Sequence, residues 1–205
     1  MEFYKTVNTR RTVRHFLEKP VEKDKIRRIL DAGFKAPSNA HLKYWEFILL
    51  KDHDNRRKAL AEVLGARNLS KGKEVEELIS RFDDEELRKV YRKSLPVQLS
   101  MMLEAPEVLL VCYQMKKRLN DMERLFDLNN LASVWMCIQN IVLAMAAEGI
   151  YGCTYTPYET EGLKQFLGVP EDYEVAVVLP FGYPEDHPGL QPDFLSDSRI
   201  HFDKW

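Results

Sequence analysis

The stretch that decides the fold is residues 10–47, which read RRTVRHFLEKPVEKDKIRRILDAGFKAPSNAHLKYWEF. Three arginines and one threonine occupy residues 10–14, a helical pattern covers Val21 to Ala36, and a small polar loop leads to a strand-like run from Trp45 to Leu50. Arginine presents a planar fork of donors that matches phosphate oxygens, and the loop offers small polar groups to a flat molecule. The arrangement indicates a nucleotide-like cofactor, although a basic cluster near an N-terminus is also typical of a solvated surface.

Outside this stretch, apolar helical patterns alternate with short apolar runs. The run from Pro106 to Tyr113 is almost continuously apolar, which is typical of a strand buried on both faces. The expected elements are helices at 21–36, 55–65, 127–148 and 163–167 and strands at 45–50, 106–113 and 174–181. Helices interleaved with a few buried strands predict a layered α/β or α+β sandwich.

Residues 66–95 differ from the rest of the chain because they are densely charged. A few apolar residues, among them Leu87, Val90 and Tyr91, recur at helical spacing within this stretch. We therefore expect an amphipathic, mostly exposed insertion whose charges face solvent. The functional alternative is a lid that covers a pocket.

Composition favours a single globular domain. The chain has 205 residues, of which 45% are hydrophobic and 11% aromatic, enough for one full core. A net charge of -2 gives no overall attraction to nucleic acid. The N-terminus lacks an apolar signal region, and the apolar runs are expected to be too short and too interrupted to span a bilayer. We expect a cytoplasmic protein with no nucleic-acid or membrane partner.

Several kinds of site find no support in the sequence. The three cysteines, Cys112, Cys137 and Cys153, are widely spaced in apolar surroundings, so buried reduced thiols are expected rather than a metal site. The sequence has no Gly-x-Gly-x-x-Gly, no Gly-Lys-Ser/Thr and no Gly-x-Ser-x-Gly. A Rossmann domain, a P-loop NTPase and an α/β-hydrolase are therefore unsupported.

Two motifs, in this order, resemble signatures of the nitroreductase family of FMN-dependent oxidoreductases. The family's Arg-Arg-Ser-x-Arg-x-Phe reads Arg10 to Phe16 here, and its Ala-Pro-Ser-x-x-Asn-x-Gln-Pro-Trp-x-Phe reads Ala36 to Phe47. The resemblance implies one domain over residues 1–205 with an α+β, nitroreductase-like layered sandwich, in which helices flank a central, mostly antiparallel sheet. It places a charged helical insertion at about 66–95 and a tail at about 185–205 that embraces the partner of a homodimer.

The resemblance also implies where FMN is held. Its positions for the phosphate and ribityl end are Arg10, Arg11 and Thr12, and Arg14 matches the basic position that faces the pyrimidine edge, where a positive charge favours reduced flavin. Pro37 to Asn39 match a loop that lies against the ring, in family dimers usually from the partner subunit. The full implied set is Arg10, Arg11, Thr12, Arg14, Pro37, Ser38, Asn39, His41, Gln98, Tyr155, Thr156 and Pro157. No catalytic residue and no metal are implied, since the flavin carries the chemistry.

Two of these positions are less certain matches, and parts of the family pattern are missing. Gln98 matches an amide that hydrogen-bonds the ring, although a surface glutamine fits the same position. His41, Lys43 and Tyr44 stand where the family has Asn, Gln and Pro, and the family's C-terminal basic residue has no clear match. These departures leave open a changed cofactor affinity or a changed substrate class.

The activity implied by the resemblance is electron transfer from NADH or NADPH, through FMN, to a small organic acceptor such as a nitroaromatic or a quinone, by a ping-pong mechanism. The alternative is a non-catalytic flavin- or anion-binding module that has lost part of the family site. A homodimer is expected on further grounds: the helix at 127–148 is apolar on most sides, including Trp135 and Met136, and the tail carries Phe202 and Trp205 with no local element to pack on.

Overall fold

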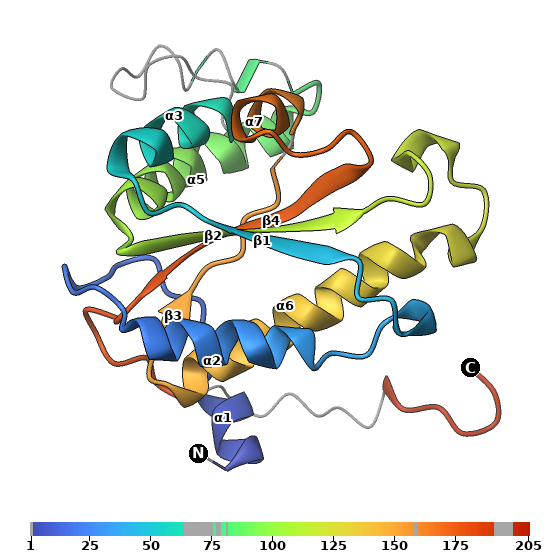
Figure 1. Cartoon of the computed structure of the whole chain (residues 1–205), viewed down its shortest axis with the longest axis horizontal. Helices are drawn as coiled ribbons and strands as arrows, with labels where there is room; N and C mark the ends of the chain where they lie inside the picture. Colours follow the sequence, from blue (N-terminus) through green and yellow to red (C-terminus); the bar gives the residue numbers. More distant parts are fainter. Residues whose placement is uncertain (1, 64–75, 77–78, 81, 158–159, 191–198) are drawn as a thin grey trace.

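A four-stranded antiparallel sheet separates two layers of helices (Figure 1). The structure is a computed structural model, and it describes residues 2–63, 76, 79–80, 82–157, 160–190 and 199–205. The strands are β1 (Trp45–Leu49), β2 (Glu107–Gln114), β3 (Tyr151–Gly152) and β4 (Tyr173–Gly182), arranged in the order β1-β2-β4-β3. The predicted α+β sandwich with an antiparallel sheet is therefore confirmed.

The two central strands, β2 and β4, contribute buried residues to the hydrophobic cores on both sides of the sheet. Every residue of β2 except Gln114 is buried, because helices cover both faces of this strand. In its register Leu110 lies opposite Ile48 of β1 on one side and Val178 of β4 on the other. The apolar run that predicted a strand buried on both faces was therefore read correctly.

The helices divide into two layers. On one face of the sheet lie α2 (Lys23–Phe34) and α6 (Asn129–Ala147), and on the other lie α3 (His53–Val63), α5 (Glu85–Glu104) and α7 (Glu161–Leu167). The short helix α1 (Phe3–Thr9) lies against α6. Three 3-10 turns complete the described elements: η1 (Asn39–His41), η2 (Leu119–Asp121) and η3 (Leu125–Leu128).

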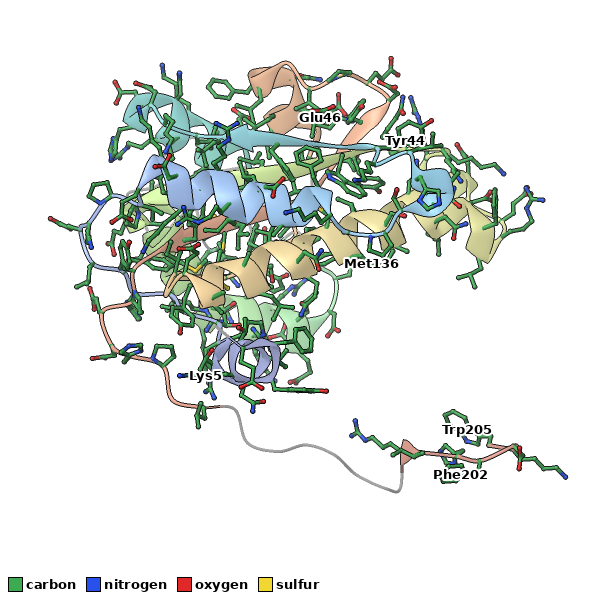
Figure 2. The ribbon with its side chains drawn as sticks, turned by 60° about the horizontal axis from the view of Figure 1, so that its bottom comes forward. Lys5, Tyr44, Glu46, Met136, Phe202 and Trp205 are labelled. Atoms are coloured by element: carbon green, nitrogen blue, oxygen red, sulfur yellow. The ribbon has the colours of Figure 1, made fainter. Side chains whose placement is uncertain are left out.

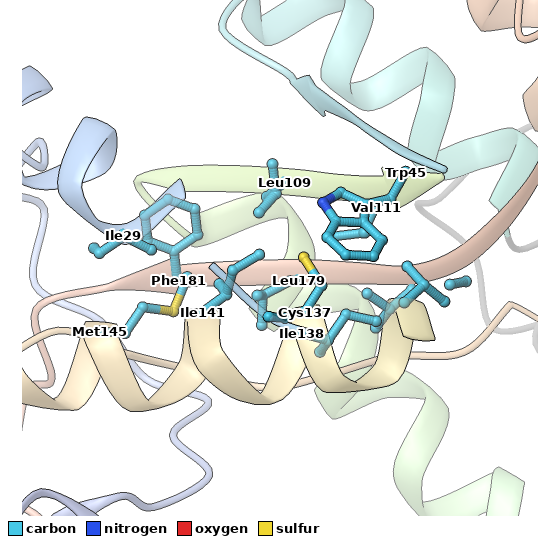
Figure 3. Packing of buried hydrophobic residues seen from close by; sticks show 14 of the residues in the cluster. Ile29, Trp45, Leu109, Val111, Cys137, Ile138, Ile141, Met145, Leu179 and Phe181 are labelled. Carbon is cyan, nitrogen blue, oxygen red and sulfur yellow. The ribbon is translucent and has the colours of Figure 1, made fainter. Parts of the chain in front are cut away.

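Helices α2 and α6 approach each other closely at Gly33. A Cβ at this position would lie 2.8 Å from Cγ1 of Ile141 and 3.0 Å from Sγ of Cys137, so only glycine fits without movement of its neighbours. Figure 3 shows the core beneath this contact, where Ile141 and Met145 of α6 point toward the sheet and meet Phe181. This layer holds α6 in a fixed position, and α6 in turn positions the candidate site.

Helix α6 is more apolar than a typical surface helix. The segment Leu125–Ala147 has 23 residues and contains an 18-residue window with a mean hydropathy of 1.5, so it is long and apolar enough to cross a membrane by length and composition alone. This corrects the expectation that every apolar run is too short for a bilayer. This window is 44% buried inside the protein, and the core helix of a globular domain passes the same test.

The charged stretch is mostly exposed in the part that the structure describes. Residues 64–75, 77–78 and 81 lie outside the described residues, so most of the first half cannot be compared with the prediction. In the described part Ile79 and Phe82 are buried, and α5 continues through residue 95 to Glu104 with Leu95 and Met102 in the core. The expectation of an amphipathic, mostly exposed segment is therefore confirmed for the described residues, although α5 extends beyond the predicted end and covers one face of the sheet. That the stretch is a family insertion stays a prediction.

The two ends of the chain were only partly predicted from the sequence. Helix α1 was missed because it has no apolar periodicity: only Thr6 is buried, while Phe3 and Tyr4 are exposed. At the other end, Figure 2 shows Phe202 and Trp205 on a segment that extends away from the body of the protein. These two side chains are 84% and 103% exposed, so the described end of the tail does not fold back on its own core.

Candidate functional site

The arginine cluster is attached to the sheet through Gly152. Thr12 forms a parallel bridge with Gly152, and the N–H of Val13 donates a hydrogen bond to the Gly152 carbonyl at 3.1 Å. A Cβ on Gly152 would lie 2.6 Å from the backbone oxygen of Pro180, so a larger residue would push the chain away from β4. Glycine at this position therefore permits the close approach that fixes the arginines at the end of β4.

A cavity of about 140 Å³ opens beside this contact. It is lined by Arg10, Arg11, Thr12, Trp135, Ile138, Gln139, Val142, Tyr151, Gly152 and Thr154. The structure thus brings together the three residues predicted to hold the phosphate end, and places them between α6 and the segment after it. Two guanidinium groups, a hydroxyl and an amide form a donor set that suits an anionic, hydroxyl-bearing molecule.

Arg14, the fourth basic position, lies beside Cys153. The charge of Arg14 and a hydrogen bond from it lower the pKa of the Cys153 thiol, but burial has the larger effect and raises that pKa overall. Burial also raises the pKa values of Cys112 and Cys137 to about 12. All three free cysteines are buried, as predicted, and remain neutral thiols at physiological pH.

The segment after Cys153 continues along β4. Tyr155 exchanges two backbone hydrogen bonds with Val178, each of 2.8 Å, and burial raises the pKa of its phenol to about 12. Pro157 is buried, whereas Thr156 is exposed. These three predicted residues therefore come directly after Thr154, which lines the cavity. The phenol of Tyr155 is neutral at physiological pH.

Gln98 lies on α5, on the other side of the sheet from α6. Its side-chain oxygen is buried and has no hydrogen-bond partner among the described residues. A buried amide oxygen without a partner costs free energy, which a ligand N–H would recover. A ring N–H of FMN would suit this oxygen, and the phosphate of FMN would suit the arginine-lined cavity, but Gln98 and that cavity lie on opposite sides of the sheet in one chain.

The loop after α2 is braced against the first turns of α6. The N–H of Asn39 donates to Oγ of Ser133 at 3.0 Å, and that hydroxyl donates to the carbonyl of Asn129 at 2.6 Å. The Asn129 amide returns a contact of 3.4 Å to Oδ1 of Asn39, and the N–H of Lys43 donates to Oγ of Ser38 at 3.1 Å. Residues 37–44 therefore form a closed loop with a fixed shape, which we call the braced loop.

Three residues of the braced loop have left-handed backbone conformations. Ala40, His41 and Lys43 have φ values of 52°, 59° and 48°. None of them is glycine, and each such conformation costs about 1–2 kcal/mol. Strain of this kind concentrates at ligand-contacting and catalytic segments, where the surrounding structure holds it in place.

The cavity and the braced loop contact different faces of α6. Successive residues of an α-helix are rotated by roughly 100°, so Ser133, which holds the loop, and Trp135, which lines the cavity, point about 160° apart around the helix axis. Ser133 is buried, and Trp135 is 38% exposed. A single chain therefore does not bring the arginines and the braced loop onto the same side of this helix, although both belong to the predicted FMN site.

The sequence interpretation missed part of the site. Trp135, Gln139 and Val142 were assigned only to a central apolar helix, and Ser133 was not singled out. The spacing of i, i+4 and i+7 for the first three residues was a usable signal, because it places them on one helix face. No comparable signal pointed to Ser133, whose partner Asn39 lies 94 positions away in the sequence.

A second hollow, of about 470 Å³, lies near the start of β4 and contains none of the predicted site residues. Its buried Lys164 lies 3.7 Å from a carboxylate oxygen of Glu174, and Arg118 lies 3.1 Å from Glu171. These four charges already form ion pairs within the protein. The arginine-lined cavity is the better candidate for an anionic ligand because it contains the predicted residues Arg10, Arg11 and Thr12.

Comparison with known proteins identifies the family to which the chain is similar. Residues 7–183 match the model of the nitroreductase family. A protein of Methanothermobacter thermautotrophicus, provisionally named NADH dehydrogenase/NAD(P)H nitroreductase, is 25% identical over all of this chain and 88% of its own length. The iodotyrosine deiodinase of Thermotoga neapolitana is 27% identical over 89% of each chain, and iodotyrosine deiodinase 1 of Rattus norvegicus is 26% identical, but the match covers only 62% of that longer protein.

Solved structures share the fold. An iodotyrosine deiodinase bound to FMN and 3-iodo-L-tyrosine matches with a TM-score of 0.73 and 20% identity over the full length of both chains. The NADPH:FMN oxidoreductase of Vibrio harveyi, in complex with NAD+, matches with a TM-score of 0.69 and 17% identity over 99% of this chain and 77% of its own. At these identities the likeness establishes the fold alone.

Proposed function

The chain belongs to the nitroreductase family, and we propose that it binds FMN and transfers electrons from NADH or NADPH to a small organic acceptor. The observation that carries this proposal is the cavity in which Arg10, Arg11 and Thr12 converge beside Gly152. The curated relatives add support, because one is named for NAD(P)H-dependent nitro reduction. The acceptor we propose is a nitroaromatic compound, a quinone or a similar flat molecule.

The residues of this chain have distinct tasks in the proposal. Arg10 and Arg11 bind the phosphate, which positions the cofactor without taking part in electron transfer, and Thr12 donates from its hydroxyl. Arg14 places a positive charge where reduction adds negative charge to the ring, which raises the reduction potential. Gln98 accepts a hydrogen bond from the ring with its buried, unpartnered oxygen.

Bound FMN would supply the redox chemistry, by taking up a hydride from the nicotinamide and passing two electrons to the acceptor. For a quinone the overall reaction is NAD(P)H + H⁺ + quinone → NAD(P)⁺ + hydroquinone, which balances in atoms and electrons. The protein supplies no nucleophile. The two substrates would use the same face of the ring in turn, which gives ping-pong kinetics.

A homodimer completes the proposed site. Because the braced loop and the arginine-lined cavity contact different faces of α6, a second copy is needed to bring a loop to each cavity. Exposed apolar side chains support the same proposal, since Trp135 and Met136 lie on α6 while Phe202 and Trp205 lie on the extended tail. The tail at 185–205 would embrace the partner subunit. We further propose that the protein works in the cytoplasm.

Reductive dehalogenation is a second candidate function. Iodotyrosine deiodinases are prominent among the curated relatives, including a bacterial one that matches over 89% of each chain. A structural neighbour holds FMN with 3-iodo-L-tyrosine. The fold and the phosphate-end residues serve both reactions equally, so the choice of acceptor separates the two candidates.

The experiment that tests the proposal begins with the absorption spectrum of the purified chain. We expect a yellow protein with bound FMN whose visible band is bleached under anaerobic conditions by NADH or NADPH and restored by a nitroaromatic or a quinone. Restoration by 3-iodotyrosine, with release of iodide, would favour dehalogenation. A flavin-loaded protein that neither pyridine nucleotide reduces would support the non-catalytic binding module, and a chain that cannot be loaded with FMN would refute both.

A further inference from the structure

The braced loop presents an unpaired cation beside the residues proposed to contact the ring. Lys43 is exposed, and its ammonium group makes no ion pair or hydrogen bond with any residue that the structure describes. Its backbone N–H, in contrast, is tied to Oγ of Ser38 at 3.1 Å. The loop therefore closes so that Lys43 lies next to Ser38, and whatever molecule contacts Ser38 lies within reach of the lysine side chain.

The backbone conformation of residue 43 indicates that the lysine side chain has a function. With φ of 48°, residue 43 has a conformation that glycine or asparagine adopts at little cost, yet the sequence places a long charged side chain there. Two neighbours, Ala40 and His41, share the left-handed conformation. The hydrogen bond from the N–H of Asn39 to the buried Ser133 of α6 and the bond from the N–H of Lys43 to Ser38 hold the backbone of the loop in this conformation.

The side chains around Lys43 suit an aromatic molecule with an acidic group. Tyr44, which follows it, is an exposed aromatic residue. His41 adds an imidazole that can donate a hydrogen bond. An ammonium group without an internal partner binds a carboxylate more strongly than a neutral amide does, because the hydrogen bond is assisted by charge.

We propose that Lys43 selects the electron acceptor, and that the preferred acceptors are aromatic or quinoid molecules that carry a carboxylate or another anionic group. The inference deepens the proposed function and rests on it, because Lys43 contacts an acceptor only if the braced loop lies over the ring of the partner subunit. The lysine binds the acidic group and orients the molecule on the flavin. It takes no part in the transfer of electrons.

The test compares two acceptors of nearly equal size, 4-nitrobenzoate and 4-nitrobenzamide, on the FMN-loaded full-length protein. We expect kcat/KM to favour the benzoate, and Lys43→Gln to reduce that preference about tenfold, the scale of a hydrogen bond to a charged group. Lys43→Arg should retain most of the preference. The matched control is Lys58→Gln, which removes an exposed charge from α3 on the opposite face of the sheet.

Two further measurements make the outcome decisive. The preference of the wild-type protein should decrease when the salt concentration is raised, since an exposed charge is screened, whereas a purely structural role of Lys43 would show no such dependence. If neither nitro compound is reduced, binding of benzoate and benzamide is measured directly from the change in flavin absorbance. Equal affinities, or an unchanged ratio in Lys43→Gln, would overturn the inference and leave the proposed function intact. A chain that holds no FMN would overturn both.

Discussion

The arginine-lined cavity and the braced loop are both expected to contact one cofactor, but the chain fixes them by different means. The cavity is fixed through the main chain, since Thr12 and Val13 pair with Gly152 at the end of the sheet. The loop is fixed through side chains, since the N–H of Asn39 donates to the hydroxyl of Ser133. Three residues of the loop also have left-handed backbone conformations. Main-chain pairing needs only a glycine that permits close approach, whereas the loop needs particular side chains and stores strain.

The largest effect is expected from Gly152→Ala, which disrupts the main-chain pairing of Thr12 and Val13 with residue 152. The new Cβ would lie 2.6 Å from the backbone oxygen of Pro180, and a backbone oxygen within β4 cannot move aside easily. We expect the free energy of unfolding in urea to fall by about 2–4 kcal/mol, the range of severe overpacking, together with loss of FMN. Gly189→Ala is the control, because nothing lies within 4 Å of its Cβ. Equal stability of the two variants would contradict the role of Gly152.

Removal of residues 186–205 should have the next largest effect. The truncation deletes the exposed aromatics of the tail and also the Leu190 carbonyl, which accepts a hydrogen bond of 3.2 Å from Arg11. We expect dimer stability and FMN retention to decrease together, measured by sedimentation velocity and by the ratio of flavin to protein after gel filtration. A full-length monomer that still holds FMN tightly would show that the site needs no second chain.

Two arginine substitutions should separate an effect on FMN binding from an effect on the flavin midpoint potential. Arg10→Ala should weaken FMN binding by roughly 1.5–3 kcal/mol, the scale of a hydrogen bond that involves a charged group. Arg14→Ala should instead lower the flavin midpoint potential more than it weakens binding, because a positive charge beside the ring stabilises its reduced form. Potentiometry and fluorescence titration of both variants make the comparison. An unchanged potential in the Arg14 variant would refute its assigned role.

The smallest effects are expected from two changes to the braced loop, and they should have opposite signs. Ser133→Ala leaves the N–H of Asn39 without its partner and should destabilise the protein by about 1–2 kcal/mol. Ala40→Gly relieves a left-handed alanine and should stabilise it by about 0.5 kcal/mol, since part of the relief is offset by the greater freedom of glycine in the unfolded chain. Thermal unfolding of both variants is the measurement, and a destabilising Ala40→Gly would show that the loop is not strained.

Elements with strong local patterns were correctly predicted. The apolar run of β2 indicated burial on both faces, and the periodicity of α2 and α6 located both helices within a few residues of their observed ends. The cluster at residues 10–14, predicted to bind a phosphate from its chemistry and from the family resemblance, lines one cavity with Arg10, Arg11 and Thr12, and its binding role stays a prediction. In each case the residues that carry the signal are neighbours in the sequence, so their spacing already expresses how they are buried.

Other features were decided only in the tertiary structure. The sequence predicted an amphipathic charged stretch that ends near residue 95, but α5 continues to Glu104 and packs Leu95 and Met102 into the core. Gly152 and Ser133 have no distinguishing local pattern, and their roles come from Thr12 and Asn39, which reach them from distant parts of the chain. The sequence by itself determined the family, the order of the elements and the chemistry of the arginine cluster. Which face of α6 each half of the site contacts depended on long-range packing, because a helix periodicity identifies a buried face without identifying what covers it.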